Sequence, residues 1–339
     1  MTALIVRSIG PGASLQDAGR RGWQRYGVGL AGAMDRWSLG VANLLVGNGA
    51  GAAAIELMLA GGRFEVADGP VRVARAGIDG ALKVDGREVA GLVSVTVPAG
   101  CVIEVGPARR GVFTYLAVAG GFAIAPQLGS LSLHARTGVG GLEGRALRPG
   151  DRLPLNLAAV GGPDVGLPPL PVADDAPIRV MLGPQDDHFS AAGIATFLES
   201  AYTITPQADR MGLRLAGPPI EHGARGYDIV SDGIPTGAIQ VPGAGEPIIM
   251  MADRQTTGGY PKIAVVISAD LPRLAQCRPG TALRFVAVDR DQAVAAARAQ
   301  AVAFAALRQQ LRPVGFAGLD SARLLALNLV DGWIDAGEG

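Results

Sequence analysis

The amino-acid sequence predicts a mainly β protein with a few helices, organised as two β-rich domains. Fifty glycines and 23 prolines separate short runs of Val, Ile and Leu, which indicates many turns between short strands. At 339 residues the chain is longer than a typical single domain. A stretch rich in proline and glycine, residues 161–177, is the best candidate for a linker between the two domains.

Residues 1–160 are expected to form the N-terminal β-rich domain. The chain begins with an apolar run that is typical of a strand, and Val93–Val97 alternates with the period of a half-buried strand. Val112–Val118 is a further apolar run. Asp85 and Gly86 stand between two short runs and predict a type I′ hairpin turn.

One helix is expected in this first domain. Asp35 can cap its N-terminus, and Gly47 can end it. The apolar face of the helix then consists of Leu39, Ala42 and Leu45.

The second domain is expected over residues 178–288, where strands dominate after the run Ile178–Leu182. Residues 189–200 read as a short amphipathic helix near its beginning. Residues 289–312 are rich in alanine and glutamine with apolar residues at helical spacing, which predicts an outer packing helix. Residues 313–339 are expected to form a peripheral tail.

The composition argues against several classes of partner. Lys plus Arg equals Asp plus Glu at 30 each, and aromatic residues make up 5% of the chain, so neither nucleic acid nor a membrane surface is expected. No apolar stretch reaches the roughly 18–20 residues of a membrane helix. The N-terminus lacks the features of a signal peptide, and Cys101 and Cys277 match no zinc or redox spacing. We therefore expect a cytoplasmic protein.

The sequence favours neither a dinucleotide-binding fold nor a metal site. Residues 27–32 match G-x-G-x-x-G, but no buried strand precedes them, which argues against a dinucleotide fold. The three histidines, His134, His188 and His222, are scattered, and isolated histidines usually make structural hydrogen bonds. No metal site is predicted.

The most polar segment, residues 251–262, lies between two apolar runs. Chains usually place such groups where they bind or react with something, because buried polar groups without partners are costly. Two adjacent glycines suggest close approach of a ligand to the backbone. The alternative is a polar hairpin turn with satisfied side chains. The residues of interest here are Asp253, Arg254, Gln255, Thr256, Tyr260 and Lys262.

A second polar group lies near the N-terminus and contains Gln16, Asp17, Arg20, Asp35 and Arg36. An arginine presents a planar fork that suits recognition of a carboxylate or carbamate. The alternative is an internal Asp–Arg pair that holds a turn.

A series of short motifs occurs in order along the chain. They are Gln16–Gly22, Gly32–Asp35, Ala42–Asn48, Ala117–Gly121, Leu128–Ser130, Gly144–Asp151, Gly183–Gln185, Asp209–Gly212, Gly237–Pro242 and Asp253–Pro261. Together they resemble the biotin-dependent carboxyltransferase family, also called the allophanate hydrolase subunit 2 family. The resemblance covers residues from about 5 to 290 and is highly specific.

The resemblance implies a cyclophilin-like barrel and a partner, the subunit 1-type (Kip-inhibitor-like) protein. It implies the role of the C-type subunit in an ATP-dependent 5-oxoprolinase complex, a hydrolase that converts 5-oxoproline to glutamate and also contains an A-type subunit. One alternative is transfer of a carboxyl group from carboxybiotin to a urea-like acceptor. Another is a regulatory protein that binds and antagonises the Kip-inhibitor-like partner.

The resemblance also suggests roles for residues. Asp253 is expected to orient or deprotonate water, and Arg254 or Lys262 to stabilise developing negative charge. The expected contacts to the small-molecule substrate are Asp17, Arg20, Asp35, Arg210, Gln240, Gln255, Thr256 and Tyr260.

The chain departs from the family pattern at Leu131–His134, where Ser-Thr-Tyr-like residues are expected. It also lacks Ala-Met-Lys-Met, the biotin attachment pattern, and any recognisable ATP-binding motif. We therefore expect no covalently bound cofactor. ATP is expected to serve the whole complex, and biotin to matter only if the carboxyltransferase alternative holds.

Overall fold

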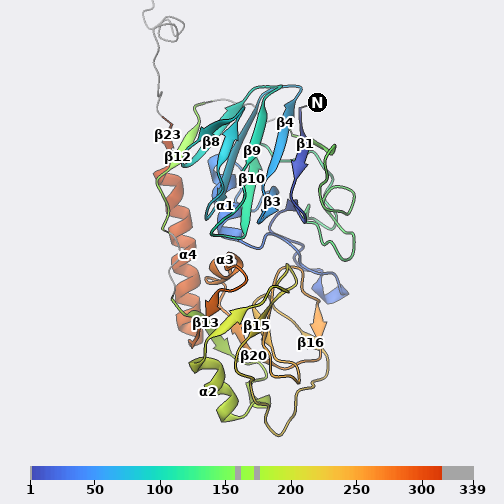
Figure 1. Ribbon diagram of the computed structural model, residues 1–339, viewed down its shortest axis with the longest axis vertical. Coiled ribbons are helices and arrows are strands. Elements are labelled where there is room, and N and C mark those ends of the chain that lie inside the picture. Colours follow the sequence, from blue (N-terminus) through green and yellow to red (C-terminus); the bar gives the residue numbers. More distant parts are fainter. Residues whose placement is uncertain (1, 157–161, 172–175, 315–339) are drawn as a thin grey trace, which may run out of the picture.

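The computed structural model describes residues 2–156, 162–171 and 176–314, which form two β-rich lobes flanked by one long helix (Figure 1). We call residues 2–156 the N-lobe and residues 178–288 the C-lobe. Strands predominate, and the described residues contain four α-helices. The prediction of a mainly β fold with a few helices is therefore confirmed.

The N-lobe contains two packed sheets. The first has six strands in the spatial order β11 (Arg152–Pro154), β1 (Ala3–Ile9), β4 (Gly62–Ala67), β9 (Val102–Val105), β6 (Leu82–Val84) and β7 (Arg87–Val89). The second has seven strands in the order β2 (Ser14–Gln16), β3 (Ala54–Met58), β10 (Phe113–Val118), β5 (Val71–Gly77), β8 (Leu92–Val97), β12 (Val165–Leu167) and β23 (Arg312–Pro313). Apolar side chains of both sheets, including Leu4, Phe64 and Leu116, form the core between them.

Helix α1 (Arg36–Leu45) covers the other face of the second sheet. Asp35 caps it by accepting a hydrogen bond from Ser38 N at 3.0 Å, as predicted. Because β10 is covered on both faces, all six of its residues are buried: Tyr115 lies on the α1 side and Leu116 in the core between the sheets.

The predicted hairpin turn is also present. Asp85 and Gly86 have φ angles of 47° and 78° between β6 and β7, as a type I′ turn requires.

The C-lobe is a nearly closed barrel of eight strands. Their order is β21 (Ala282–Leu283), β14 (Tyr202–Ile204), β15 (Gly212–Ala216), β18 (Ile248–Met250), β17 (Ala238–Gln240), β20 (Lys262–Val266), β13 (Ile178–Leu182) and β22 (Phe285–Ala287). The two edge strands, β21 and β22, are separated in sequence by Arg284 alone, which brings the two ends of the sheet together. The predicted helix near residues 189–200 is α2 (Ala191–Glu199), capped by Ser190.

The two lobes share one hydrophobic core, which runs from α1 and β10 into the barrel. Short helix α3 (Leu271–Ala275) lies at this junction. The predicted outer helix, α4 (Arg290–Gln310), begins at a capping box formed by Asp289 and Gln292 and runs beside both lobes (Figure 1). None of the helices in the described ranges is both long and apolar enough to cross a membrane.

The segment expected as a linker, residues 161–177, also contributes a strand. Its β12 pairs with β8 and with β23, so this stretch extends the second N-lobe sheet as well as connecting the lobes. Of the expected tail, residues 313–339, only Pro313 and Val314 belong to the described part; residues 315–339 lie outside it.

Candidate active site at the lobe junction

The polar segment 251–262 connects two strands of the barrel, as the sequence predicts. β18 ends at Met250 and β20 begins at Lys262. Between them β19 (Thr257–Gly258) pairs with β16 (Asp232–Gly233) in a separate two-stranded ribbon. The first residues of the segment contact the N-lobe, whereas Lys262 contacts Asp232 within the C-lobe.

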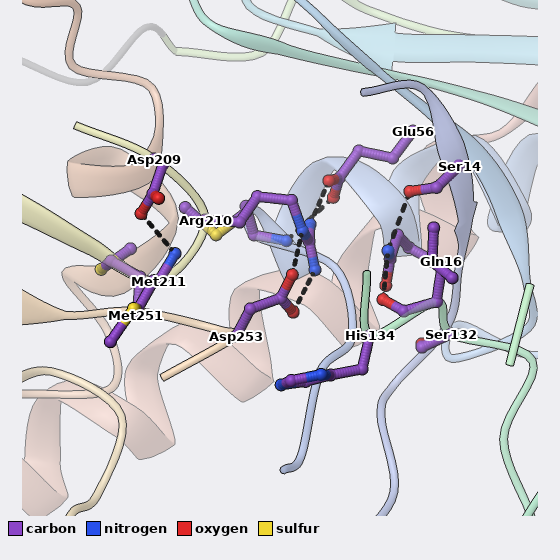
Figure 2. A network of polar contacts seen from close by, with 12 residues as sticks. Ser14, Gln16, Glu56, Ser132, His134, Asp209, Arg210, Met211, Met251 and Asp253 are labelled. Carbon is purple, nitrogen blue, oxygen red and sulfur yellow. Dashed lines mark hydrogen bonds and ion pairs between the residues drawn. The ribbon is translucent and has the colours of Figure 1, made fainter. Parts of the chain in front are cut away.

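Arg210 lies between two acids, one from each lobe (Figure 2). Its Nε and Nη2 donate to the two carboxylate oxygens of Asp253, both at 2.9 Å, and its Nη1 donates to Glu56 on β3. Nη2 also donates to Gly32 O at 2.8 Å. Burial alone would lower the pKa of Arg210, but the charges of Glu56 and Asp253 raise it above its usual value. The charged guanidinium therefore binds the lobes together through four hydrogen bonds.

Hydrogen bonds continue from this ion pair through the N-lobe. Glu56 Oε2 accepts from Tyr115 Oη at 2.7 Å and from Met34 N at 3.0 Å. Tyr115 Oη in turn accepts from Asp35 N at 2.8 Å, and the Asp35 carboxylate accepts from Gln276 Nε2 at 2.7 Å. Burial raises the pKa of the Asp35 carboxyl, against the effect of these hydrogen bonds. Asp35 thus forms a structural hydrogen bond with Gln276 at the lobe junction.

Arg254 is buried beside this network but has no acidic partner among the described residues. Its Nε donates to Ile234 O at 2.7 Å, Nη1 to Met251 O at 3.3 Å and Nη2 to Gln24 Oε1 at 3.5 Å. All three acceptors are neutral. Its exposed fraction is 4%. Burial, together with the charge of Arg36, lowers its pKa to about 10. Arg254 therefore carries a positive charge that no described carboxylate neutralises by direct contact.

Gln24 covers this guanidinium from the N-lobe. It opens the short 3₁₀ helix Gln24–Tyr26, and its amide nitrogen donates to Ile234 O at 3.1 Å and Thr256 O at 3.2 Å. Its side-chain oxygen, Oε1, accepts from Arg254 Nη2 at 3.5 Å. Gly22 and Gly27, on either side, have φ angles of 86° and 78°, a left-handed conformation that glycine adopts without strain.

Asp17 and Arg20 are used to hold a loop of the N-lobe. Asp17 accepts from Gly19 N, Leu131 N and the hydroxyls of Ser130 and Ser132. The Arg20 guanidinium donates to main-chain oxygens of the same loop at Gln127, Ser132 and Val139. Arg20 is 1% exposed, and its Nη1 is buried without a hydrogen-bond partner in the described structure. Asp17 and Arg20 thus hold the same loop through separate hydrogen bonds.

Lys262 lies in a third group, away from the junction. It is fully buried on β20, and its Nζ contacts Asp232 Oδ2 at 2.9 Å. Gln185 Nε2 donates to the same oxygen at 3.1 Å. The hydrogen bond from Lys262 lowers the pKa of Asp232, with further contributions from Gly233 N and Gln185. Gln240 Nε2 donates to Tyr260 O at 3.2 Å nearby in the chain.

The remaining residues of the segment lie at or near the surface. Gln255 and Tyr260 are exposed, and Thr256 is half-buried, with its carbonyl bound by Gln24. Among the predicted site residues, the structure thus brings Arg210, Asp253 and Asp35 into one connected network. Within the described residues, no hydrogen bond joins this network directly to Asp17, to Arg20 or to the Lys262 group, although the charge of Asp253 acts on Arg20.

Four contributors were missed from sequence: Glu56, Tyr115, Gln24 and Asp232. Glu56 carried a usable signal, because it is the lone acid in the otherwise apolar strand β3, and a buried acid requires partners. Gln24 and Asp232 stand in polar surroundings and carried none.

Each histidine has its own hydrogen-bonding partner, although His188 and His222 lie in neighbouring segments, where Phe189 pairs with His222. His134 Nδ1 contacts Thr137 Oγ1 at 3.0 Å, His188 Nδ1 contacts Gly226 O at 3.0 Å, and His222 Nε2 contacts Val241 O at 3.1 Å. Within the described ranges, no group of three or more His, Cys, Asp or Glu side chains is arranged to hold a metal ion.

Comparison with known proteins identifies the family. Residues 26–287 match the family described as carboxyltransferase domain, subdomain A and B. The chain belongs to this family. It is 36% identical to the 5-oxoprolinase C subunit of Haemophilus influenzae over 281 residues, which are 83% of this chain and 90% of that protein. It is also 36% identical to the C subunit of Escherichia coli 5-oxoprolinase over 300 residues, which are 87% and 94% of the two chains.

A solved structure supports the same assignment. The Kluyveromyces lactis urea carboxylase matches with a TM-score of 0.81 and 28% identity over 94% of this chain. This chain spans only 30% of that protein. The predicted family resemblance is therefore confirmed.

Proposed function

We propose that this chain is the C-type subunit of an ATP-dependent 5-oxoprolinase complex, which converts 5-oxoproline to glutamate. The observation that carries the proposal is the 36% identity to two 5-oxoprolinase C subunits, each covered over at least 90% of its length. The proposed partners are a subunit 1-type (Kip-inhibitor-like) protein and an A-type subunit. ATP is used by the complex, and no step of that use is assigned to this chain.

The chemistry requires a site for negative charge. 5-Oxoproline has a carboxylate and a ring amide. In ring opening, the oxygen of water bonds to the amide carbon, the carbon–nitrogen bond breaks, and the nitrogen takes up a proton. The carbonyl oxygen gains negative charge as water adds. A buried cation beside that oxygen stabilises the transition state more strongly than one in water does.

Arg254 has the properties that this role needs. It is charged, buried and bound to neutral oxygens, of which Gln24 Oε1 is the most distant at 3.5 Å. We propose that an oxygen of the substrate takes the place of Gln24 Oε1. This exchange requires the Gln24 side chain to give up its hydrogen bonds to Ile234 O and Thr256 O, and the glycines on either side, Gly22 and Gly27, restrict the backbone less than other residues would. Lys262 is the second candidate for this role, but its amine is already paired with Asp232.

Asp253 takes a positioning role in this proposal. Both of its carboxylate oxygens accept from Arg210, which leaves it poorly placed to accept a proton from water. The pairing instead fixes the backbone of the residue that precedes Arg254. Arg20, with its donors on main-chain oxygens, supports the N-lobe loop.

Carboxyl transfer is the second candidate, favoured by the structural match to urea carboxylase. The chain has two lysines, Lys83 and Lys262, and neither stands in Ala-Met-Lys-Met. Lys262 is fully buried against Asp232, so it does not fit as a biotin attachment site. A carboxybiotin donor would have to come from another protein.

The experiment is reconstitution with both proposed partners. We expect glutamate formation and ATP hydrolysis that depend on 5-oxoproline, and loss of both with Arg254→Gln. Arg225→Gln is the matched control, because Arg225 is an exposed partner of Asp187.

A complex that forms but turns over no 5-oxoproline would contradict the proposal and favour the regulatory alternative. A biotinylated partner detected with streptavidin, together with carboxylation of a urea-like acceptor, would favour carboxyl transfer.

A further inference from the structure

A cavity of about 470 Å³ lies at the lobe junction beside α4. One wall is residues 30–37 of the N-lobe, another is Met251–Ala252 at the start of the polar segment, and the third is α4. The size is within the range of small-molecule pockets, which often form between domains. Most of its surface is apolar, with contributions from Trp37, Leu271 and Phe304.

Small side chains create this space. α4 presents Ala297 and Ala301 to it, and the facing walls present Ala31, Ala33 and Ala252. Ala301 is exposed although it lies on the inner side of the helix, so the cavity is open to solvent beside it. A methylene-rich ligand could therefore enter without unfolding the helix.

The position of α4 over the cavity is fixed at several points. The ring of Phe304 packs edge-on against Trp37, with centroids 5.4 Å apart. A side chain at Gly40 would come within 2.7 Å of the Phe304 ring, so glycine is needed for this close approach. Gln300 Nε2 donates to Ala269 O at 2.9 Å. The cavity is thus a preformed feature, which lowers the cost of binding.

The charge on the described lining of the cavity is positive. Arg36 is the lone charged residue among the described residues that line the cavity. It is exposed, and its Nη2 donates to Ala18 O at 3.0 Å. The neighbouring Arg21 and Arg254 add positive charge. The nearby acid Asp17 already accepts four hydrogen bonds.

We propose that this cavity binds a small anionic amphiphile, an unbranched acyl carboxylate whose chain fills the apolar space and whose head group meets Arg36. The apolar walls select the chain, and the single guanidinium at the edge selects the carboxylate. The cavity adjoins the proposed 5-oxoproline site, since the charge of Arg36 acts on Arg254. Its ligand differs in class, because 5-oxoproline is small and polar whereas most of the cavity surface is apolar. The proposal stands whether or not the proposed function does.

Trp37 provides a direct measurement of binding. We expect hexanoate, octanoate and decanoate to change the fluorescence of the purified full-length protein, and Trp37→Phe to remove the change. Affinity should rise about fourfold for each added methylene, since burying one contributes about 0.8 kcal/mol. Decanol and decyltrimethylammonium should bind at least about tenfold more weakly than decanoate, because they lack the charge-assisted contact.

Two pairs of variants test the location, with binding followed by calorimetry. Ala301→Phe fills the cavity and should abolish decanoate binding, whereas Ala303→Phe, at an exposed alanine of the same helix outside the cavity, should not. Arg36→Gln should weaken binding about tenfold, whereas Arg298→Gln on the outer side of α4 should not. Thermal unfolding confirms that each variant is folded.

Absence of binding by all three carboxylates would overturn the proposal. Equal binding of decanoate and decanol, or equal effects of the two members of either variant pair, would overturn it as well.

Discussion

Arg210 and Arg254 are both arginines of the lobe junction, yet their surroundings differ. Arg210 contacts two carboxylates, Glu56 and Asp253, and one carbonyl oxygen. Arg254 contacts two carbonyl oxygens and one amide oxygen. Asp253 connects the two positions, since it pairs with Arg210 and directly precedes Arg254.

The sequence placed Arg210 and Arg254 at the same site. Their different partners give Arg210 a structural role and leave Arg254 as the candidate for the chemical role. A cation that is matched by two acids has no charge left for a ligand. A buried cation with neutral partners loses its hydration without gaining contact with a carboxylate. Proteins usually tolerate this cost at functional sites. The same substitution at the two positions should therefore have opposite consequences.

Arg210→Met should produce the largest effect, a loss of about 3–5 kcal/mol of unfolding free energy, because it leaves Glu56 and Asp253 buried without their cation. Urea unfolding measures it. Arg225→Met, which removes an exposed ion pair, should change stability by no more than about 1 kcal/mol. Equal stability of the two variants would show that the junction pair does not hold the lobes together.

Arg254→Met should leave stability nearly unchanged but lower the turnover of the reconstituted complex about 10²–10³-fold, as expected for loss of a transition-state contact. Stability is spared because no described carboxylate loses its partner. The measurement is kcat for 5-oxoproline beside urea unfolding of the same preparation. If the variant is strongly destabilised but its folded fraction has normal turnover, Arg254 is a structural residue like Arg210.

Asp253→Asn distinguishes positioning from proton transfer. It weakens two charge-assisted hydrogen bonds, and a loss of about 1.5–3 kcal/mol of stability is expected. If Asp253 only positions Arg210, turnover per folded complex should change less than about tenfold. A loss of about 10²-fold or more, with the pH profile altered on its acidic side, would restore the predicted role of Asp253 as a base.

Asp232 and Lys262 should give the smallest effect, since the Asp232 side chain is 52% exposed and an asparagine there keeps an oxygen that can accept from the buried Lys262 amine. The folded pKa of Asp232 lies below its ordinary value of 3.8, so its contribution is present above that pH and is lost as pH falls through the folded pKa. Asp232→Asn should lower stability by about 1 kcal/mol at pH 6, and the difference should shrink as pH falls below 3.8 toward the folded pKa of Asp232. A difference that grows on acidification would contradict this pairing.

Local signals in the sequence predicted much of the fold. Asp35 as a helix cap, the Asp85–Gly86 turn and the outer helix after Asp289 depend on neighbouring residues, and all three are present. The polar segment between two buried strands was also located correctly. These features are predictable because the interactions that form them span only a few residues.

The partners within the site were not predictable in the same way. Glu56 and Arg210 are 154 residues apart, and nothing in either local sequence specifies the other. The saturation of Asp17 depends on Ser130 and Ser132, more than 110 residues away. The cavity beside α4 depends on alanines, whose small size matters only when the facing wall is known.

The sharing of one ion pair between lobes has a consequence for how the family can diversify. Acid and guanidinium are encoded on opposite sides of the segment 157–177, so a crossover there would separate them. A chimera of this chain and a relative should keep its junction only where the incoming lobe supplies an acid at the position of Glu56 or a guanidinium at that of Arg210. The two lobes are therefore expected to be inherited as a matched set, with recombination tolerated within a lobe more readily than between lobes.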